Sequence, residues 1–212
     1  SAKDMEAERE AVGDAVRLTC IVSMPLSLGL CLFSKQILEL IFAGENEAIA
    51  LTSPLLSILA LSVTLSCLVT VGNAVLQSYG KANIPMWSMV AGAVAKITLA
   101  YVLIGNKSIG IAGAPISTFF CDLTINLINF YHISKELPNP VKLKKTVLSP
   151  FLSAAISVIA ARSLFNFIEK GLGESALASV ISIGAAAVIY LPICFVTGAI
   201  GRDDVKRITR GR

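Results

Sequence analysis

The chain has 212 residues, of which 55% are hydrophobic and only 15% are charged, and its mean hydropathy is +0.76. A water-soluble domain of this size has no interior large enough for so much apolar surface. Long apolar runs of helical length indicate helices, because the strands of a membrane barrel show alternating segments of about ten residues. We therefore expect an all-α integral membrane protein. The net charge of +4 fits membrane topology and anionic lipid headgroups, and we expect no nucleic-acid partner.

Residues that usually carry catalysis or bind metals are few. The single histidine, His132, stands at the end of an expected helix, without a second histidine to share a metal ion. Five cysteines lie inside apolar segments without paired spacing, which is typical of small core residues; they are Cys20, Cys31, Cys67, Cys121 and Cys194. We expect no metal site, no cofactor and no catalytic residue, and therefore no enzyme.

The first part of the chain predicts a surface segment and then a membrane crossing. Residues 1–17 are charged and helix-prone and lack the apolar core of a signal peptide, so we place them on the cytoplasmic membrane surface or in water. The first crossing runs from 18 to about 33 and contains Pro25, which membrane helices tolerate. Lys35 and Glu39 then alternate with apolar residues, which predicts an amphipathic element at the interface.

A second crossing over residues 51–79 follows an exposed loop at 43–47, and it carries a polar stripe. The stripe has steps of four, four, three and four residues, which place its members on one helical face; they are Ser62, Ser66, Thr70, Asn73 and Gln77. Serine and threonine alone would indicate helix packing. The two amides near one end also allow a hydrated cavity.

Two further crossings, 85–104 and 109–133, form a hairpin around the polar turn 105–108, and each contains a charge. Lys96 lies about eleven residues into the first helix and Asp122 about thirteen into the second, so both fall near mid-membrane depth. A charge there costs roughly 2.5–3.5 kcal/mol on insertion scales. Lys96 shares its face with small residues, and the neighbours of Asp122 at helical spacing are Thr118, Asn126 and Asn129. Two interpretations remain open: a structural Lys96–Asp122 ion pair, or a charged lining of a substrate pathway.

The last third of the chain predicts a separate helix pair. A Pro-Asn-Pro sequence at 138–140 breaks the chain, and crossings at 146–168 and 175–200 follow, both with small-residue faces. We therefore divide the chain into the surface segment 1–17, a four-helix unit at 18–137, a helix pair at 138–201 and a basic tail at 202–212. The tail is expected along the inner leaflet.

Basic residues in the loops orient these six crossings. The outer loops contain two, Lys107 and Lys170. Thirteen lie on the other side: Lys3, Arg9, Arg17, Lys81, Lys135, Lys142, Lys144, Lys145, Arg202, Lys206, Arg207, Arg210 and Arg212. This bias predicts that both ends of the chain are cytoplasmic.

Three stretches carry a resemblance to a known family: 25–42 (PLSLGL…SKQILELIF), 75–85 (VLQSYGKANIP) and 109–118 (IGIAGAPIST). In this order and spacing they resemble the C-terminal half of the polysaccharide-transporter branch of the MOP flippase superfamily, which is MATE-like. Within it, the nearest groups are those of stage V sporulation protein B and the MurJ-like lipid II flippases.

The resemblance implies a transporter of fourteen helices, of which the six crossings here would be numbers nine to fourteen. It implies that the N-terminal half is missing from this chain, together with most of the arginines that hold the pyrophosphate of the substrate. It further implies movement of a lipid-linked oligosaccharide or peptidoglycan precursor, such as lipid II, across the bacterial cytoplasmic membrane by alternating access. Relatives often have a basic residue at the position of Lys96 and Asn at that of Ala100.

Other functions are kept as alternatives. One is a cation-coupled exporter of drugs or organic ions within the same superfamily, and another is a membrane scaffold without transport. A membrane-embedded transferase would need an acid or histidine at an interface, whereas Asp122 is at mid-membrane depth. For a flippase, the candidate pathway residues are the charged and polar members of the stripes: Lys96, Asp122, Asn126, Asn129, Ser66, Thr70, Asn73 and Gln77.

The orientation is testable by labelling single cysteines introduced into a cysteine-free background. Positions 46, 107 and 171 should react with a membrane-impermeant maleimide from outside the cell, whereas positions 83 and 139 should react only after permeabilisation. The reverse pattern would show that the orientation is wrong.

Overall fold

A computed structural model describes residues 2–42, 45–136, 148–172 and 184, and the regular structure in these ranges is entirely helical. The helices are α1 (Ala2–Leu32), α2 (Ser34–Ile41), α3 (Asn46–Ser78), α4 (Asn83–Gly105), the short 3-10 helix η1 (Gly110–Ala112), α5 (Gly113–Glu136) and α6 (Ser149–Leu172). The expectation of an all-α protein is thus confirmed for the described residues.

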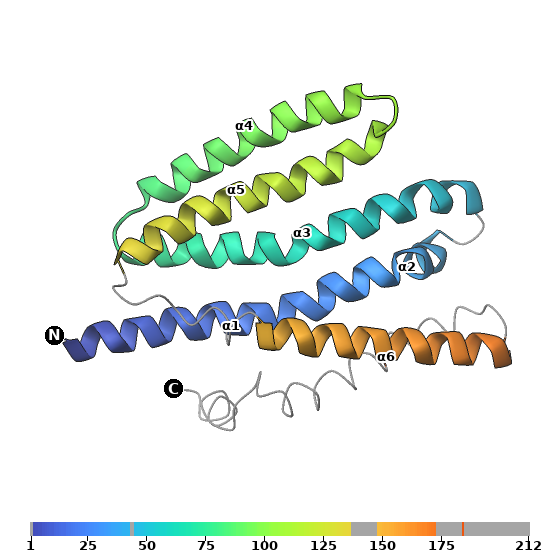
Figure 1. Ribbon diagram of the computed structural model, residues 1–212, viewed down its shortest axis with the longest axis horizontal. Helices are drawn as coiled ribbons and strands as arrows, with labels where there is room; N and C mark the ends of the chain where they lie inside the picture. The colour runs from blue at the N-terminus through green and yellow to red at the C-terminus, as the bar shows by residue number, and fades with distance from the viewer. Residues whose placement is uncertain (1, 43–44, 137–147, 173–183, 185–212) are drawn as a thin grey trace.

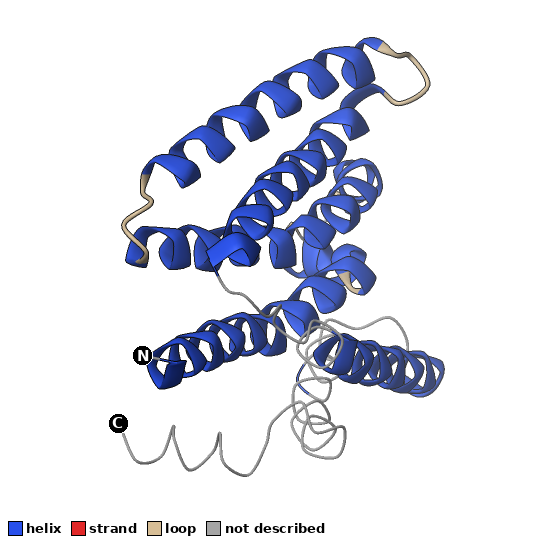
Figure 2. Ribbon diagram, turned by 60° about the vertical axis from the view of Figure 1, so that its left-hand side comes forward, coloured by secondary structure: helices blue, strands red, loops and turns tan. Residues whose placement is uncertain are grey.

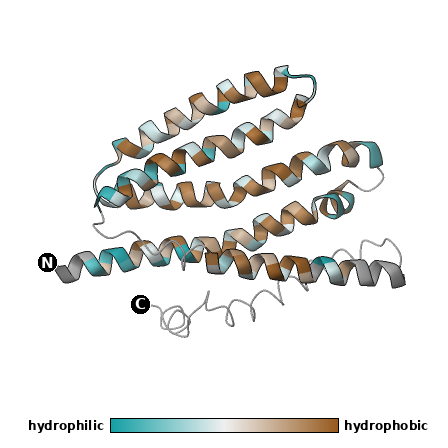
Figure 3. Ribbon diagram, viewed as in Figure 1, coloured by the Kyte–Doolittle hydropathy of each residue, from teal (hydrophilic) through white to brown (hydrophobic). Residues whose placement is uncertain are grey.

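Four helical segments in the described ranges are long and apolar enough to cross a membrane: Glu6–Leu32, Asn46–Ser78, Asn83–Gly105 and Gly110–Glu136. They correspond to the first four predicted crossings and make the chain a multi-pass membrane protein. The fifth predicted crossing corresponds to α6. The apolar part of this helix, Pro150–Ala160, is shorter than the other four segments. The sixth crossing, the break at 138–140 and the tail lie outside the described residues. In Figure 3 the long helices are mostly hydrophobic and the α3–α4 and α4–η1 turns are hydrophilic.

The helix α1 begins much earlier than predicted. Its charged first turns continue directly into the apolar part, with Pro25 inside the helix. Val12 is buried against Val75 of α3, and the Tyr79 hydroxyl lies 3.5 Å from a carboxylate oxygen of Glu8. The segment therefore packs against the C-terminal end of α3 instead of forming a separate surface element. Alanine and glutamate favour helix, and apolar residues such as Val12 give this part of α1 a packing face.

The short helix α2 is the amphipathic element expected after the first crossing. Its exposed charges pair with one another, with Lys35 Nζ 3.4 Å from Glu39 Oε1. On its other side Ser34 is buried, and the hydroxyl groups of Ser34 and Ser57 are 2.6 Å apart. The next helix, α3, begins at Asn46 rather than 51. With 33 residues it is about 50 Å long, more than the hydrocarbon core requires, so it tilts or extends beyond the core.

The described helices stack in the order α4, α5, α3, α1 and α6 (Figure 1; Figure 2 gives a second view). Chain direction alternates between α1 and α3 and between α4 and α5, while α3 and α5 run parallel. Hydrogen bonds fix this arrangement: Ser27 of α1 donates to the carbonyl of Ala60 in α3 at 2.6 Å. Figure 1 also shows that α3 and α5 lie together at their C-terminal ends and diverge toward their N-terminal ends.

The helix α6 packs on α1 through small and aromatic residues. Ala154 joins a buried cluster with Cys20, and Phe165 contacts Phe33 edge to face with ring centroids 6.0 Å apart. Ser153 and Ser157 are fully buried, which confirms the predicted small-residue face. The guanidinium of Arg162 lies 5.3 Å from the Phe165 ring centroid and 5.8 Å from that of Phe33, where cation–π attraction offsets part of the burial cost.

Glycines allow α4 and α5 to approach closely. A Cβ atom on Gly92 would lie 2.5 Å from Cγ1 of Ile125, and one on Gly113 would lie 2.7 Å from Cβ of Leu103 and 2.9 Å from the backbone nitrogen of Ile104. Small residues at such positions permit the backbone contact that holds membrane helices together.

Adding a methyl group at these glycines should therefore destabilise the hairpin. We expect Gly113→Ala to lower the free energy of unfolding by about 1–3 kcal/mol, because the new Cβ meets backbone atoms that cannot move alone. Gly92→Ala should be costly as well, and Ile125→Ala should partly rescue it, since the clash is with that side chain. Thermal unfolding in detergent measures both effects. Gly29→Ala is the control, because nothing lies within 4 Å of the added atom; equal losses at Gly29 and Gly113 would contradict the argument.

Candidate functional site

A row of polar side chains joins α3 to α5 within the membrane-spanning part of the bundle. We call it the polar seam; its members are Ser66 and Asn73 on α3 and Asp122, Asn126 and Asn129 on α5. Since α3 and α5 run parallel, contacts form between residues 56 positions apart, as in Ser66–Asp122 and Asn73–Asn129. The two stripes predicted separately from the sequence thus face one another.

The central residue of the seam is Asn129, which is 1% exposed and connects three helices. Its amide nitrogen donates to Asn73 Oδ1 at 2.7 Å, and its carbonyl oxygen accepts a 2.8 Å hydrogen bond from the hydroxyl of Ser88 on α4. Gly72 leaves room for it, because a Cβ there would lie 3.3 Å from Asn129 Nδ2. Both ends of the Asn129 amide are therefore satisfied by side chains from two other helices.

Asn126 lies about one turn, and Asp122 two turns, before Asn129 on α5. The Ser66 hydroxyl donates to the Oδ2 atom of Asp122. Asn126 donates to two backbone carbonyls, that of Leu65 on α3 at 2.9 Å and that of Asp122 at 2.8 Å. Asp122 is partly exposed, so its carboxylate is held by α3 and remains accessible.

Three members of the predicted α3 stripe do not join the seam. Thr70 donates to the carbonyl of Ser66 within its own helix at 3.2 Å, which a threonine in a helix does readily. Gln77 is exposed, and no side-chain partner for it occurs within the described part of the chain. Ser62 is buried and likewise bonds within α3, to the carbonyl of Leu59.

Lys96 lies at nearly the depth of Asp122, but the two side chains are not paired. The contacts Ser88–Asn129 and Gly92–Ile125 set a register in which Lys96 is level with residues 120–122. Among the described residues, however, Lys96 forms no ion pair with the Asp122 carboxylate, unlike the pairs Lys35–Glu39 and Lys81–Glu136. The reason is rotation: eight residues at 100° each turn Lys96 about 80° from Ser88, away from the α4–α5 contact. The predicted equal depth is found, but the direct ion pair is not formed.

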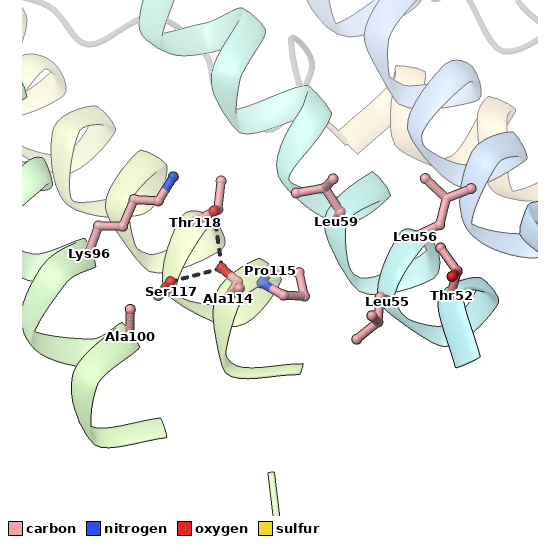
Figure 4. Close-up of a pocket in the computed structure, with 10 residues that line it drawn as sticks. All are labelled: Thr52, Leu55, Leu56, Leu59, Lys96, Ala100, Ala114, Pro115, Ser117 and Thr118. Carbon is pink, nitrogen blue, oxygen red and sulfur yellow. Dashed lines mark hydrogen bonds between the residues drawn. The ribbon is translucent and has the colours of Figure 1, made fainter. Parts of the chain in front are cut away.

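Lys96 lines a cavity where the N-terminal halves of α3 and α5 diverge (Figure 4). Its volume is about 390 Å³. The walls come from α3, α4 and α5; the lining residues are Thr52, Leu55, Leu56, Leu59, Lys96, Ala100, Ala114, Pro115, Ser117 and Thr118. Ser117 and Thr118 both donate to the carbonyl of Ala114, at 2.8 and 3.1 Å. We call this space the Lys96 cavity.

A charged cluster lies beyond the seam, at the α3–α4 turn. Lys81 Nζ pairs with Glu136 at the end of α5, and Tyr79 approaches Glu8 of α1. Partial burial, together with the nearby carboxylate of Glu8, raises the pKa of the Tyr79 hydroxyl. Among the described residues, no group of three or more His, Cys, Asp or Glu side chains is placed to hold a metal ion.

The spacing of residues placed Ser88 on the same helical face as Lys96, Gly92 and Ala100, but did not identify it as a partner of Asn129. Gly72 was not singled out. Gly72 could have been noticed because it immediately precedes Asn73, in a helix otherwise poor in glycine. Neither signal says which neighbouring helix provides the partner.

These features define the class of the protein: a multi-pass helical membrane protein with polar and charged groups at membrane depth. Comparison with known proteins is more specific. The MatE family matches residues 1–102. Over 208 residues, 97% of the chain, the sequence is 26% identical to stage V sporulation protein B of Bacillus subtilis (strain 168), and it spans 38% of that protein's length. No solved structure matches the chain. The matches confirm the resemblance to the MOP superfamily and its polysaccharide-transporter branch.

The seam predicts coupling between Asn73 and Asn129. A double-mutant cycle with alanine at both positions should give an interaction energy of about 0.6–1.7 kcal/mol, the range for hydrogen bonds between membrane helices. Reversible unfolding in detergent or bicelles measures it. Gln77→Ala is the matched control on the same helix face and should change stability by less than about 0.5 kcal/mol. Additive effects of the two asparagine changes would contradict the hydrogen bond.

Proposed function

We propose that this chain forms part of a flippase that moves a lipid-linked oligosaccharide or peptidoglycan precursor, of the lipid II kind, across the cytoplasmic membrane. In this proposal its crossings are helices nine to fourteen of a fourteen-helix transporter, and both of its ends are cytoplasmic. The similarity to stage V sporulation protein B along 97% of the chain supports the proposal. It rests most directly on one structural observation: Lys96 and Asp122 are both accessible at membrane depth and are not paired with each other.

Ionisable residues at this depth are costly and face a bundle interior or a wet cavity, so they mark pathways by default. A lipid-linked saccharide needs such groups, because its sugars and phosphates lose their hydration when they cross the hydrocarbon core. The polar seam offers hydroxyl, amide and carboxylate groups suited to sugars, and Lys96 offers the positive charge suited to phosphate. Alternating access would expose these groups to one side of the membrane at a time.

The alternative of an organic-cation exporter is less well supported. Lys96 is the charged member of the ten residues that line the cavity, and Asp122 is not among them. A positive wall repels a cationic drug, whereas it attracts an anionic headgroup. A scaffold without transport would leave the two intramembrane charges without a role.

The proposal is tested by reconstituting the full-length natural protein in liposomes with a fluorescent lipid-linked saccharide and measuring its transbilayer movement by quenching of the outer leaflet. Lys96→Gln should slow this movement at least about tenfold, because a hydrogen bond to a charged group is worth about 1.5 kcal/mol or more. Lys107→Gln, in the exposed α4–η1 turn, is the matched control and should leave the rate unchanged. No protein-dependent movement of the saccharide lipid, or export of ethidium instead, would refute the flippase.

A further inference from the structure

A basic side chain on α6, away from the seam and from the Lys96 cavity, has an unusual environment. Arg162 follows the apolar part of this helix, Pro150–Ala160, and α6 lies beside α1 (Figure 1). The guanidinium of Arg162 lies against Phe33 and Phe165, which are both buried. Phe33 is the residue between α1 and the amphipathic helix α2. Arg162 therefore lies at a boundary of the membrane rather than at its centre.

The protein surrounds this guanidinium with aromatic rings but gives it no carboxylate. The Nη1 atom of Arg162 is enclosed, and no hydrogen-bond partner for it occurs within the described residues. The carboxylate of α2, Glu39, is paired with Lys35. Arginine remains charged at any physiological pH and has five N–H donors in one plane. The rings attract this charge without neutralising it, so the guanidinium still lacks an anionic partner.

The exposed side of α6 next to Arg162 is apolar. Ile156 and Ile159, six and three residues earlier, are both more than half exposed, and their spacing places them on one side of the helix. On the other side Val158 is buried against the end of α1. Arg162 itself is half-buried. It thus stands where the packed face of α6 meets the face that is open to lipid.

We infer that Arg162 binds the phosphate of an anionic phospholipid, such as phosphatidylglycerol, whose acyl chain lies along Ile159 and Ile156. A guanidinium suits a phosphate, because its planar N–H groups can donate two parallel hydrogen bonds. Phospholipid headgroups lie at the boundary depth of Arg162, and the two isoleucines continue from it toward the membrane interior.

Such a lipid would hold α6 against α1 by supplying the anion that the protein does not. This role goes beyond the flippase proposal, because the site is separate from the seam and from the Lys96 cavity. With both ends of the chain cytoplasmic, as proposed above, α1 runs outward and the lipid belongs to the outer leaflet.

Quenching by spin-labelled lipids tests the site. The reporter is a bimane fluorophore attached to the cysteine of Ile159→Cys, in an otherwise cysteine-free full-length protein in phosphatidylcholine vesicles. A minor fraction of the vesicle lipid is either phosphatidylglycerol or phosphatidylcholine with a doxyl group on its acyl chain. We expect about a fivefold preference for the anionic quencher, the effect of one basic residue near an anionic lipid.

The Arg162 variants decide the outcome. Arg162→Gln should abolish the preference, and Arg162→Lys, which keeps the charge, should retain part of it. The matched control removes a charge pair from the same boundary, Lys35→Gln with Glu39→Gln, and should leave the preference unchanged. If Arg162→Gln does not give a uniform size-exclusion profile, Arg162→Met replaces it, because a flexible apolar side chain fits against both rings. Equal quenching by the two lipids, or a preference that survives loss of the charge, would overturn the site.

Soluble glycerol 3-phosphate separates a phospholipid site from a general phosphate site. It carries a phosphate ester without acyl chains, so millimolar addition should leave the quenching by phosphatidylglycerol unchanged. Relief of the quenching would show that the site takes a free phosphate and would overturn the phospholipid.

Discussion

The arrangement of α3, α4 and α5 depends on one buried amide. Asn129 receives a hydrogen bond from α4 and gives one to α3, and in hydrocarbon no water is present to replace either partner. A slip of α5 by one residue would break both bonds together. Gly72 and Gly92, on the neighbouring helices, have no side chains and so let α5 come close enough for these bonds to form. The hydrogen bonds of Asn129 and the close packing of the helices thus occur at the same contact.

Much of this unit could be predicted from residue spacing alone. Polar stripes at steps of three and four residues identify a helical face, and Ser66, Asn73, Asp122 and Asn129 do meet across one contact. Equal depth of Lys96 and Asp122 followed from the antiparallel hairpin. The partner of each charge did not follow, because steps of four drift by 40° each and the sequence does not say where the neighbouring helix lies. Asp122 consequently turned to α3 rather than to Lys96.

Other differences have similar causes. The charged start of α1 was predicted to be separate, since local polarity does not reveal that Val12 packs against Val75. Arg162 lies against Phe165, three residues later in the same helix, and against Phe33, which is 129 residues earlier in the sequence and comes close only through the fold. Helix type and approximate bounds are local properties, whereas these contacts are made between distant segments.

Turning Asp122 away from Lys96 keeps opposite charges in separate environments. In a direct ion pair the two charges would neutralise each other, and neither would be available to a ligand. As the helices are arranged, Asp122 accepts a hydrogen bond from Ser66 of α3, whereas Lys96 lines the cavity. The same bundle therefore presents a basic cavity and an acidic seam at one depth.

The contact between α3 and α5 also defines a pivot for any tilt of α3. The seam joins these helices from Asn73 to Ser66, and Thr52, at the far edge of the cavity, lies 14 residues before Ser66 along α3, or about 21 Å away. Each degree of tilt about Ser66 would therefore shift the cavity wall by about 0.4 Å. A tilt of about ten degrees would change the width of the cavity by about 4 Å, the diameter of a methylene group, while the hydrogen bonds of the seam stay nearly fixed. Polar contacts along the C-terminal half of α3 thus leave the width of the cavity at its N-terminal half to vary with the tilt of this helix.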